Sequence, residues 1–182
     1  MDRRTAIKNM ALSLGFAVSG STVISLFNAC SNEKSALEAE FFKAEDMHNI
    51  NFLTEIILPT TSTPGAKELN IAQFVDKMCQ HVLGAEKQQA VVSGAAEYAR
   101  RFEQHTGIAS YNGQKPDHEG MIAKYFDLSE NDEKSVLKML ATEASAIPEK
   151  EKSEYNLYSF LTTVRELSML GYFTSETVVE LA

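Results

Sequence analysis

The 182-residue sequence contains no tryptophan and only two cysteines, Cys30 and Cys79. Two cysteines so far apart cannot supply the C-x-x-C-H motif that attaches a c-type haem. If Cys30 is lipidated, as considered below, Cys79 has no partner within the chain and an internal disulfide is excluded. Cys79 also falls on an apolar helical stripe, so we expect a small core residue rather than a reactive thiol.

Motifs for cofactors, metals and catalysis are equally scarce. The sequence has no G-x-G-x-x-G, phosphate-loop or G-x-S-x-G pattern, which are signatures of nucleotide, flavin and hydrolase sites. Glu45-Asp46-Met47-His48 matches Glu-x-x-His, but a helical di-iron site uses two such motifs and the chain has one. Glu103 with His105, and Asp117 with His118, point to different sides of a helix, so we expect solvated polar faces there. The sequence therefore predicts no catalytic, cofactor-binding or metal site in this chain.

Positive charge is in deficit, since 17 Lys and Arg residues stand against 25 Asp and Glu, for a net charge of -8. Removal of residues 1–29, which hold three basic residues and one acidic residue, would change the net charge to -10. A nucleic-acid-binding protein needs a basic face to neutralise phosphates, so we expect no nucleic-acid partner. An acidic surface of this kind commonly keeps a protein soluble.

The start of the sequence has the layout of an export signal. Arg3 and Arg4 precede Lys8, and the run from Met10 to Ala29 carries no charge. A basic start, an apolar middle and a small residue at the end are typical of a secretory signal, and the arginine pair indicates the twin-arginine route. The alternative is a permanent transmembrane helix, because twenty uncharged residues could just span a bilayer. We favour the export signal, and with it a periplasmic protein that the twin-arginine translocase carries.

Cys30 follows the apolar run directly and is preceded by the small residue Ala29. This arrangement resembles a lipoprotein cleavage site, where the cysteine becomes the lipidated first residue and anchors the protein to a membrane. Cleavage by an ordinary signal peptidase near the same place is the alternative. We therefore expect a signal segment over residues 1–29, a tether over residues 30–44 and a helical domain over residues 45–182.

Apolar residues of the mature chain recur at spacings of three and four, and no stretch alternates convincingly at period two. This pattern predicts an all-α fold, and we expect a single irregular bundle of about five to six helices. The predicted helices run from about Glu45 to Leu58, Ile71 to Leu83, Ala85 to His105, Asp117 to Phe126, Glu130 to Ser145 and Glu151 to Leu170.

Capping and helix-breaking residues predict where these helices begin and end. Pro59 ends the first helix, because the residue before a proline is steered out of the helical region. Asn70 is the expected N-cap of the second helix and Gly84 its stop. Ser129 is the expected cap of the fifth helix, and Gly171 closes the last one in the left-handed conformation.

The predicted helices have apolar faces that we expect to be buried. The residues on these faces are Met47, Ile50, Leu53 and Ile57; Ile71, Phe74, Val75, Met78, Cys79 and Val82; Val91, Val92, Ala95, Tyr98, Ala99 and Phe102; Val136, Leu137 and Leu140; and Leu157, Leu161, Val164, Leu167 and Leu170.

Two segments stand out by their order and separation behind the export signal. Residues 53–59 read Leu-Thr-Glu-Ile-Ile-Leu-Pro and are followed by Thr-Pro-Gly-Ala at residues 63–66. Residues 167–176 read Leu-Ser-Met-Leu-Gly-Tyr-Phe-Thr-Ser-Glu. Together they resemble the small subunit, subunit 3 or gamma, of membrane-associated gluconate 2-dehydrogenase, and the resemblance spans roughly residues 46–176.

The resemblance implies a helical companion of a large FAD-dependent flavoprotein of the glucose-methanol-choline oxidoreductase type, which oxidises a sugar or sugar acid. In such complexes a cytochrome c often takes the electrons, and the small subunit carries the export signal for a flavoprotein that lacks one. We therefore expect a non-catalytic accessory subunit that supports folding, stability and export of its partner. It would bind no cofactor itself, and FAD would sit in the partner.

Two alternatives stay open, a stand-alone helical periplasmic lipoprotein with a binding role and a ferritin-like metalloprotein that uses His48. Under the resemblance, the loop and the end of the last helix are the candidate partner interface, since aromatic residues dominate binding energy where they fill pockets. The candidates are Pro59, Pro64, Gly65, Gly171, Tyr172 and Phe173. The alternative for the loop is a plain turn between two helices, and for the aromatic residues it is core packing.

Overall fold

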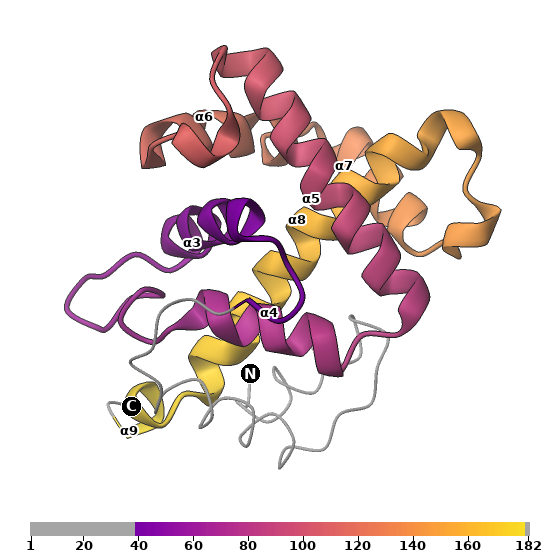
Figure 1. Ribbon diagram of the computed structural model, residues 1–182. Coiled ribbons are helices and arrows are strands. Elements are labelled where there is room, and N and C mark those ends of the chain that lie inside the picture. The colour runs from indigo at the N-terminus through magenta and orange to yellow at the C-terminus, as the bar shows by residue number, and fades with distance from the viewer. Residues whose placement is uncertain (1–38, 181–182) are drawn as a thin grey trace. The chain divides into compact units, whose positions relative to one another are not determined.

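The computed structural model describes residues 39–180, and Figure 1 shows its helices. Within that range every regular element is an α-helix or a short 3-10 helix, and none is a strand, which confirms the predicted all-α fold. In chain order the elements are α3 (Ala44–Ile57), α4 (Ile71–His81), α5 (Ala85–Thr106), η1 (Ser110–Asn112), α6 (Lys115–Phe126), α7 (Glu130–Leu140), η2 (Ala144–Ala146), α8 (Glu149–Thr174) and α9 (Glu176–Glu180). Arg3, Arg4 and Cys30 lie outside the described residues.

The chain divides into two compact units that share α8. Unit 1 combines the residues up to Leu83 with those from Thr163 onward, and unit 2 is Gly84–Thr162. The first part of α8 therefore belongs to unit 2 and its last part to unit 1. Unit 1 is thus discontinuous in sequence, whereas unit 2 is one uninterrupted stretch.

In unit 1, α3 packs against α4. Five residues of the predicted apolar stripe of α4 are fully buried, namely Ile71, Phe74, Val75, Met78 and Cys79. Val82, the sixth, follows the end of α4 and is half-buried. Cys79 is fully buried in this core, as expected for a small packing residue. Each large apolar side chain buried in this way contributes roughly 1.5–3 kcal/mol, so this face fixes the position of α4 in the unit.

Asn70 precedes α4 as predicted, but it caps the helix in a different way. Its backbone is left-handed, with φ 51° and ψ 37°, and its side chain makes no capping hydrogen bond. Asn tolerates this conformation better than most residues. The backbone N–H of Ile71 donates to the carbonyl of Ala66 at 2.9 Å across the turn. Asn70 is therefore a turn residue and not a side-chain cap.

Gly171 does not close the last helix, because α8 continues to Thr174. The glycine is buried inside the helix and faces Phe74. A Cβ at this position would lie 2.7 Å from Cδ1 of the Phe74 ring, closer than carbon atoms pack. The prediction of a left-handed stop is therefore wrong, and the absence of a side chain serves the close approach of an aromatic ring.

The chain that leads into α3 is held on α4 by the carboxylate of Asp76. This carboxylate accepts the backbone N–H groups of Glu40 at 2.7 Å, Phe41 at 3.1 Å and Phe42 at 2.9 Å. Asp76 is only 2% exposed, so the three N–H groups replace the water that an ionised carboxylate would otherwise bind. The end of the predicted tether is thereby fixed to the helical core.

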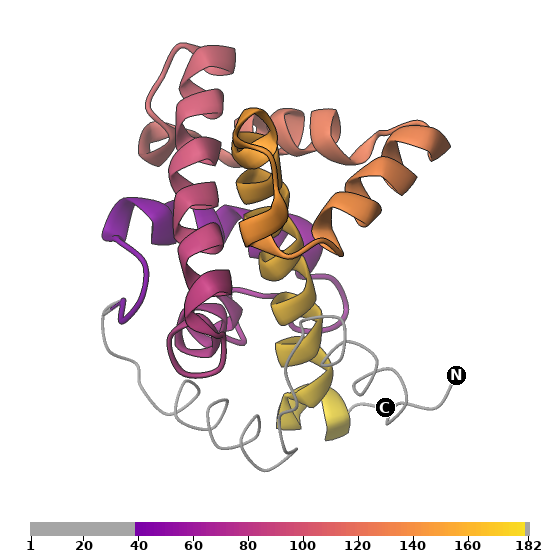
Figure 2. The same ribbon diagram turned by 90° about the vertical axis from the view of Figure 1, so that its right-hand side faces the viewer.

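In unit 2, α5 and the first part of α8 meet at Gly94, and Figure 2 shows the two helices side by side. A Cβ on Gly94 would lie 2.0 Å from the carbonyl oxygen of Asn156 and 2.6 Å from Cβ of Phe160. Tyr98 and Phe160 pack with ring centroids 5.8 Å apart. The small residue therefore lets two helix backbones approach, and aromatic rings fill the space beside it.

His118 is buried, although the sequence places it on a solvated face. Its exposure is 0%, and Nδ1 lies 2.8 Å from the hydroxyl of Tyr98. The ring also lies 4.6 Å from that of Phe102, centroid to centroid. The prediction was wrong because the charged residues next to His118 in the sequence do not indicate which face of α6 packs against α5. Burial raises the pKa of the Tyr98 hydroxyl, so this side chain stays protonated.

Gly84 is the N-cap of α5 and not the stop of α4, which ends earlier at His81. Gly84 adopts an extended conformation with φ -67°, so it needs no left-handed backbone. On α5, Val92 was expected inward and is 40% exposed. Its neighbour Val91 is fully buried, which shows that the apolar face of the helix is narrower than the sequence suggests.

The predicted helix over residues 130–145 is shorter and less buried than expected. It ends at Leu140 as α7, and none of its residues is buried. Leu137, expected in the core, is 58% exposed. Ser129 does cap the helix, and its hydroxyl accepts the backbone N–H of Asp132 at 3.3 Å. The amphipathic pattern therefore predicted the helix correctly, but few neighbouring side chains cover the apolar side of α7.

Candidate partner-docking site at the Pro59–Gly65 loop

The loop between α3 and α4 begins where the sequence predicts. The backbone N–H of Leu58 makes the last helical bond of α3, to the carbonyl of Thr54 at 2.9 Å. Pro59 follows and is exposed. A proline cannot continue the hydrogen-bond ladder and restricts the residue before it, so the chain leaves the helix here. The carbonyl of Leu58 then accepts the N–H of Ala66 at 2.9 Å, which closes the base of the loop.

The tip of the loop is organised by its own threonines. The N–H of Thr61 donates to the carbonyl of Thr63 at 3.1 Å. The hydroxyls of the same two residues lie 3.3 Å apart. These local bonds compensate for the lack of regular structure. The loop is therefore an ordered turn that presents exposed hydroxyls.

Gly65 lies buried on the inner side of the loop. Its N–H donates to Oε2 of Glu68 at 2.9 Å. A Cβ on Gly65 would lie 2.5 Å from both the backbone nitrogen and Oγ1 of Thr60. The loop closes this tightly only because Gly65 has no side chain, so the Pro64-Gly65 pair fixes the shape of the loop.

The loop and the end of α8 meet at Tyr172, which lies 109 positions after Thr63 in the sequence. The Tyr172 hydroxyl donates to Oγ1 of Thr63 at 3.2 Å. Tyr172 and Phe173 are both half-buried, and their rings stand edge to face with centroids 5.5 Å apart. The structure thus brings together the two segments on which the family resemblance rests, at a half-buried aromatic pair.

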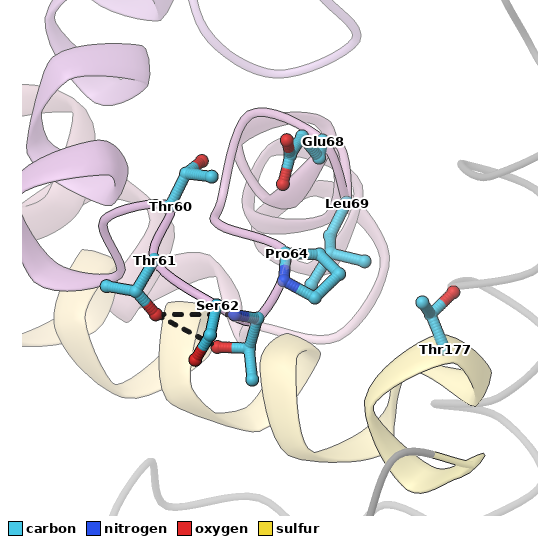
Figure 3. Close-up of a pocket in the computed structure, with 8 residues that line it drawn as sticks. Thr60, Thr61, Ser62, Pro64, Glu68, Leu69 and Thr177 are labelled. Atoms are coloured by element: carbon cyan, nitrogen blue, oxygen red, sulfur yellow. Dashed lines mark hydrogen bonds between the residues drawn. The ribbon is translucent and has the colours of Figure 1, made fainter.

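A pocket of about 380 Å³ lies against this loop (Figure 3). Its lining residues are Thr60, Thr61, Ser62, Thr63, Pro64, Glu68, Leu69 and Thr177. Most of them are exposed polar residues, and Leu69 adds a small apolar floor that is 8% exposed. Such a surface can exchange hydrogen bonds with a partner and receive a protruding side chain from it.

The structure locates the six interface candidates in different surroundings. Pro59 is exposed at the start of the loop, and Pro64 lines the pocket. Gly65 and Gly171 are buried and act through packing. Tyr172 forms a hydrogen bond with the loop, whereas Phe173 packs against the ring of Tyr172. The candidates for direct contact with a partner are therefore reduced to the exposed and half-buried members.

Sequence reasoning missed the contributions of Glu68, Leu69 and Thr177 to this site. Thr177 belongs to α9, a short helix that the apolar pattern did not predict. Glu68 could have been recognised as a side chain three positions after Gly65, a spacing that allows the carboxylate to reach back to a backbone N–H. Nothing in the sequence signals the position of Thr177.

No cluster of three or more His, Cys, Asp or Glu side chains with the spacing for a metal ion occurs within residues 39–180. His48, the candidate ligand of the single Glu-x-x-His motif, packs edge to face on Phe52 with centroids 5.0 Å apart. Over the same residues, no helix combines the length and apolarity that a bilayer crossing requires.

One family model matches the chain, over residues 44–182, and it describes gluconate 2-dehydrogenase subunit 3. No curated protein and no solved structure matches the chain. The family match begins at the first residue of α3 and covers every described helix. It includes both the Pro59–Gly65 loop and the Tyr172–Phe173 pair. The chain therefore belongs to the gluconate 2-dehydrogenase subunit 3 family.

Proposed function

We propose that this chain is the non-catalytic small subunit of a periplasmic, FAD-dependent sugar or sugar-acid dehydrogenase complex. Membership of the subunit 3 family implies a subunit of a gluconate 2-dehydrogenase complex. In the proposal, the catalytic partner is a large flavoprotein that holds FAD, and a cytochrome c accepts the electrons. The small subunit supports the folding and stability of the flavoprotein and takes it through the twin-arginine translocase by means of Arg3 and Arg4.

The observation that carries this proposal is the family match over residues 44–182. Two further features agree with it. The sequence lacks the glycine-rich motif of a flavin site, as expected if FAD belongs to another subunit. The loop and Tyr172 present an ordered surface of hydroxyls and half-buried aromatic rings, and interfaces are enriched in tyrosine and other aromatic residues.

We propose that the Pro59–Gly65 loop and Tyr172 contact the flavoprotein. Lipidation of Cys30 would attach the complex to a membrane, and the net charge of -8 argues against a nucleic-acid partner. In this arrangement the small subunit contributes a docking surface and the export signal, while the redox chemistry takes place in its partner.

Co-purification tests the proposal. The full chain, tagged at its C-terminus, is expressed together with a candidate flavoprotein of the glucose-methanol-choline type, and the eluate is examined for a second polypeptide and for flavin absorbance. Both are expected with the partner, and neither with this chain alone. Recovery of the tagged chain as a lone monomer in the presence of the flavoprotein would show that the proposal is wrong.

Two matched variants test the docking surface. Ser62→Arg places a long cation on an exposed residue of the pocket, and Asn131→Arg makes the same change at an exposed residue of α7. Recovery of the flavoprotein should fall at least tenfold with the first variant, because burial of an unpaired charge in an interface opposes binding, and stay unchanged with the second. Equal recovery with both would exclude this loop as the interface without affecting the subunit assignment.

A further inference from the structure

Helix α6 of unit 2 is held against α5 by very few buried side chains. Of the residues that the structure describes in α6, two are buried, His118 and Met121, whereas α5 buries six. His118 is the one of the two that can change its charge, and an ordinary histidine does so at about pH 6.5. A titratable side chain therefore makes up much of the buried contact between α6 and α5.

The ring of His118 is enclosed by aromatic rings and by the backbone of the loop before α6. The ring of Tyr98 stacks on it with centroids 6.0 Å apart, and that of Phe102 lies at 4.6 Å. A Cβ on Gly113 would lie 3.1 Å from Nε2 of His118 and 2.4 Å from Cζ of Phe102, so the loop closes over both rings. Water can therefore hydrate the imidazole only when the loop or α6 moves away from α5.

The charged groups nearest to His118 in sequence and on α5 have other roles. The carboxylate of Asp117 accepts a backbone N–H at the start of α6 at 2.9 Å, and Glu119 is exposed. On α5, the carboxylate of Glu97 is bonded to two arginines of its own helix. Burial raises the pKa of Tyr98, so its phenol stays uncharged. The ring faces around His118 attract a cation, but the loss of water on burial is the larger effect, and it favours the neutral imidazole.

A second histidine bond joins the same two helices at the protein surface. Nδ1 of His105, on α5, lies 2.7 Å from the ammonium of Lys124, on α6. An ammonium can only donate, so this bond requires an unprotonated Nδ1. Protonation of His105 would replace the bond with two adjacent positive charges, and Arg100 and Arg101 line the same surface pocket. Acid pH therefore opposes the contact between α5 and α6 at two separate points.

We propose that residues 107–126 form a pH-sensitive switch, in which protonation of His118, assisted by His105, releases α6 and the loop before it from α5. The closed form disfavours a charged imidazole, whereas release exposes the ring to water, where histidine titrates at about pH 6.5. The contact is therefore fully stable above about pH 6.5 and weakens as the pH falls below it. The release is local, because α5 keeps its packing against α8 at Gly94 and Phe160. The switch is a property of this chain and does not rest on the proposed flavoprotein partner.

Hydrogen exchange of the full chain, followed by mass spectrometry at about pH 7.5 and about pH 5.5, tests the proposal. Exchange rates are corrected for the intrinsic effect of pH on unprotected amides. The protection of the α6 amides should fall at least about tenfold, because one pH unit below 6.5 favours an exposed, protonated imidazole by about that factor. The amides of α4, in unit 1, should keep their protection in the same samples. Constant protection of α6, or an equal fall in α4, would overturn the proposal.

Variants assign the response to its histidines. His118→Gln keeps a polar side chain that takes up no proton in this range, and it should remove most of the fall in α6 protection. His105→Gln should reduce the fall by a smaller factor. His81→Gln changes an exposed histidine of α4 and should respond as the parent chain does.

An unchanged response in His118→Gln would refute this residue as the sensor. If His118→Gln leaves α6 unprotected already at about pH 7.5, above the range in which histidine titrates, the comparison of α6 with α4 in the parent chain decides alone. Because these measurements use this chain without a flavoprotein, their failure is distinct from failure of the co-purification.

Discussion

The Oδ1 atom of Asp76 accepts the backbone N–H of Phe42 at 2.9 Å, in a carboxylate that is 2% exposed. The same carboxylate binds two more backbone N–H groups immediately before Phe42. A single side chain on α4 therefore holds residues 40–42 on unit 1. The consequences for stability are direct, because buried N–H groups that lose a charged acceptor are left desolvated.

Asp76→Ala should lower the free energy of unfolding by about 3 kcal/mol, since hydrogen bonds to a charged group contribute roughly 1.5–3 kcal/mol each and are not additive. Asp76→Asn should cost less, because its amide retains one acceptor oxygen. Urea unfolding measures both. Glu133→Ala, at an exposed residue of α7, should stay within about 0.5 kcal/mol of the parent chain. A similarly small change for Asp76→Ala would mean that the N-terminal segment does not depend on this carboxylate.

Gly94 and Gly120 give opposite predictions for the same substitution. Gly94→Ala places a Cβ 2.0 Å from the carbonyl oxygen of Asn156, and the backbone there cannot move aside without shifting α8. We expect a loss of at least about 2 kcal/mol, which is typical of overpacking between helices. Gly120→Ala, at an exposed position of α6, meets no atom within 4 Å and should gain about 0.5–1 kcal/mol from helix propensity. Thermal unfolding of both variants checks the pair, and loss of stability in both would contradict it.

Glu97 makes stability depend on acid pH. Hydrogen bonds from Arg100, Ser153 and Arg101, of which that from Arg100 has the largest effect, hold the pKa of Glu97 at about 2, below the usual 4.5. Because the folded-state pKa is lowered, the unfolded chain binds the proton more readily, and stability falls as pH drops from about 4.5 to 2. Urea unfolding of the parent chain and of Glu97→Gln should show a steeper decline for the parent. Parallel pH profiles would show that this carboxylate is not the source.

If the proposed export route is right, replacement of Arg3 and Arg4 by Lys should keep both this chain and the proposed flavoprotein partner in the cytoplasm, because the twin-arginine route requires the arginine pair. Cell fractionation with immunodetection of both proteins measures the outcome. A matched Lys8→Arg change, which keeps the charge and the arginine pair, should leave export intact. If the flavoprotein still reaches the periplasm when Arg3 and Arg4 are replaced, the small subunit is not its carrier.

The sequence predicted the helices well where one face is both regular and fully covered. In α4 the spacing of Ile71, Phe74 and Met78 identified the buried side correctly. The same reasoning failed for Leu137, because periodicity identifies the side of a helix that is apolar but not the number of neighbours that cover it. The prediction for Gly171 failed for another reason. A helix stop and a close aromatic contact both favour glycine, and only the position of the Phe74 ring distinguishes them.

The candidate site was predictable in part. The start of the Pro59–Gly65 loop follows from a helix-breaking residue, since α3 ends at Ile57, but the irregular chain continues past Gly65 until α4 begins at Ile71. The bond between Tyr172 and Thr63 could not be foreseen, because it joins residues 109 positions apart.

Unit 1 combines the beginning and the end of the described chain. It can therefore be completed only late in synthesis. Phe74 can pack against Gly171, and Thr63 can bind Tyr172, only after the ribosome has released nearly the whole polypeptide. Contacts between distant residues also close slowly, because the intervening chain must be ordered first. The proposed export route accepts folded proteins. The signal at the N-terminus is therefore synthesised first, but it can direct export only after unit 1 has folded. Synthesis of α8 would then determine when export can begin.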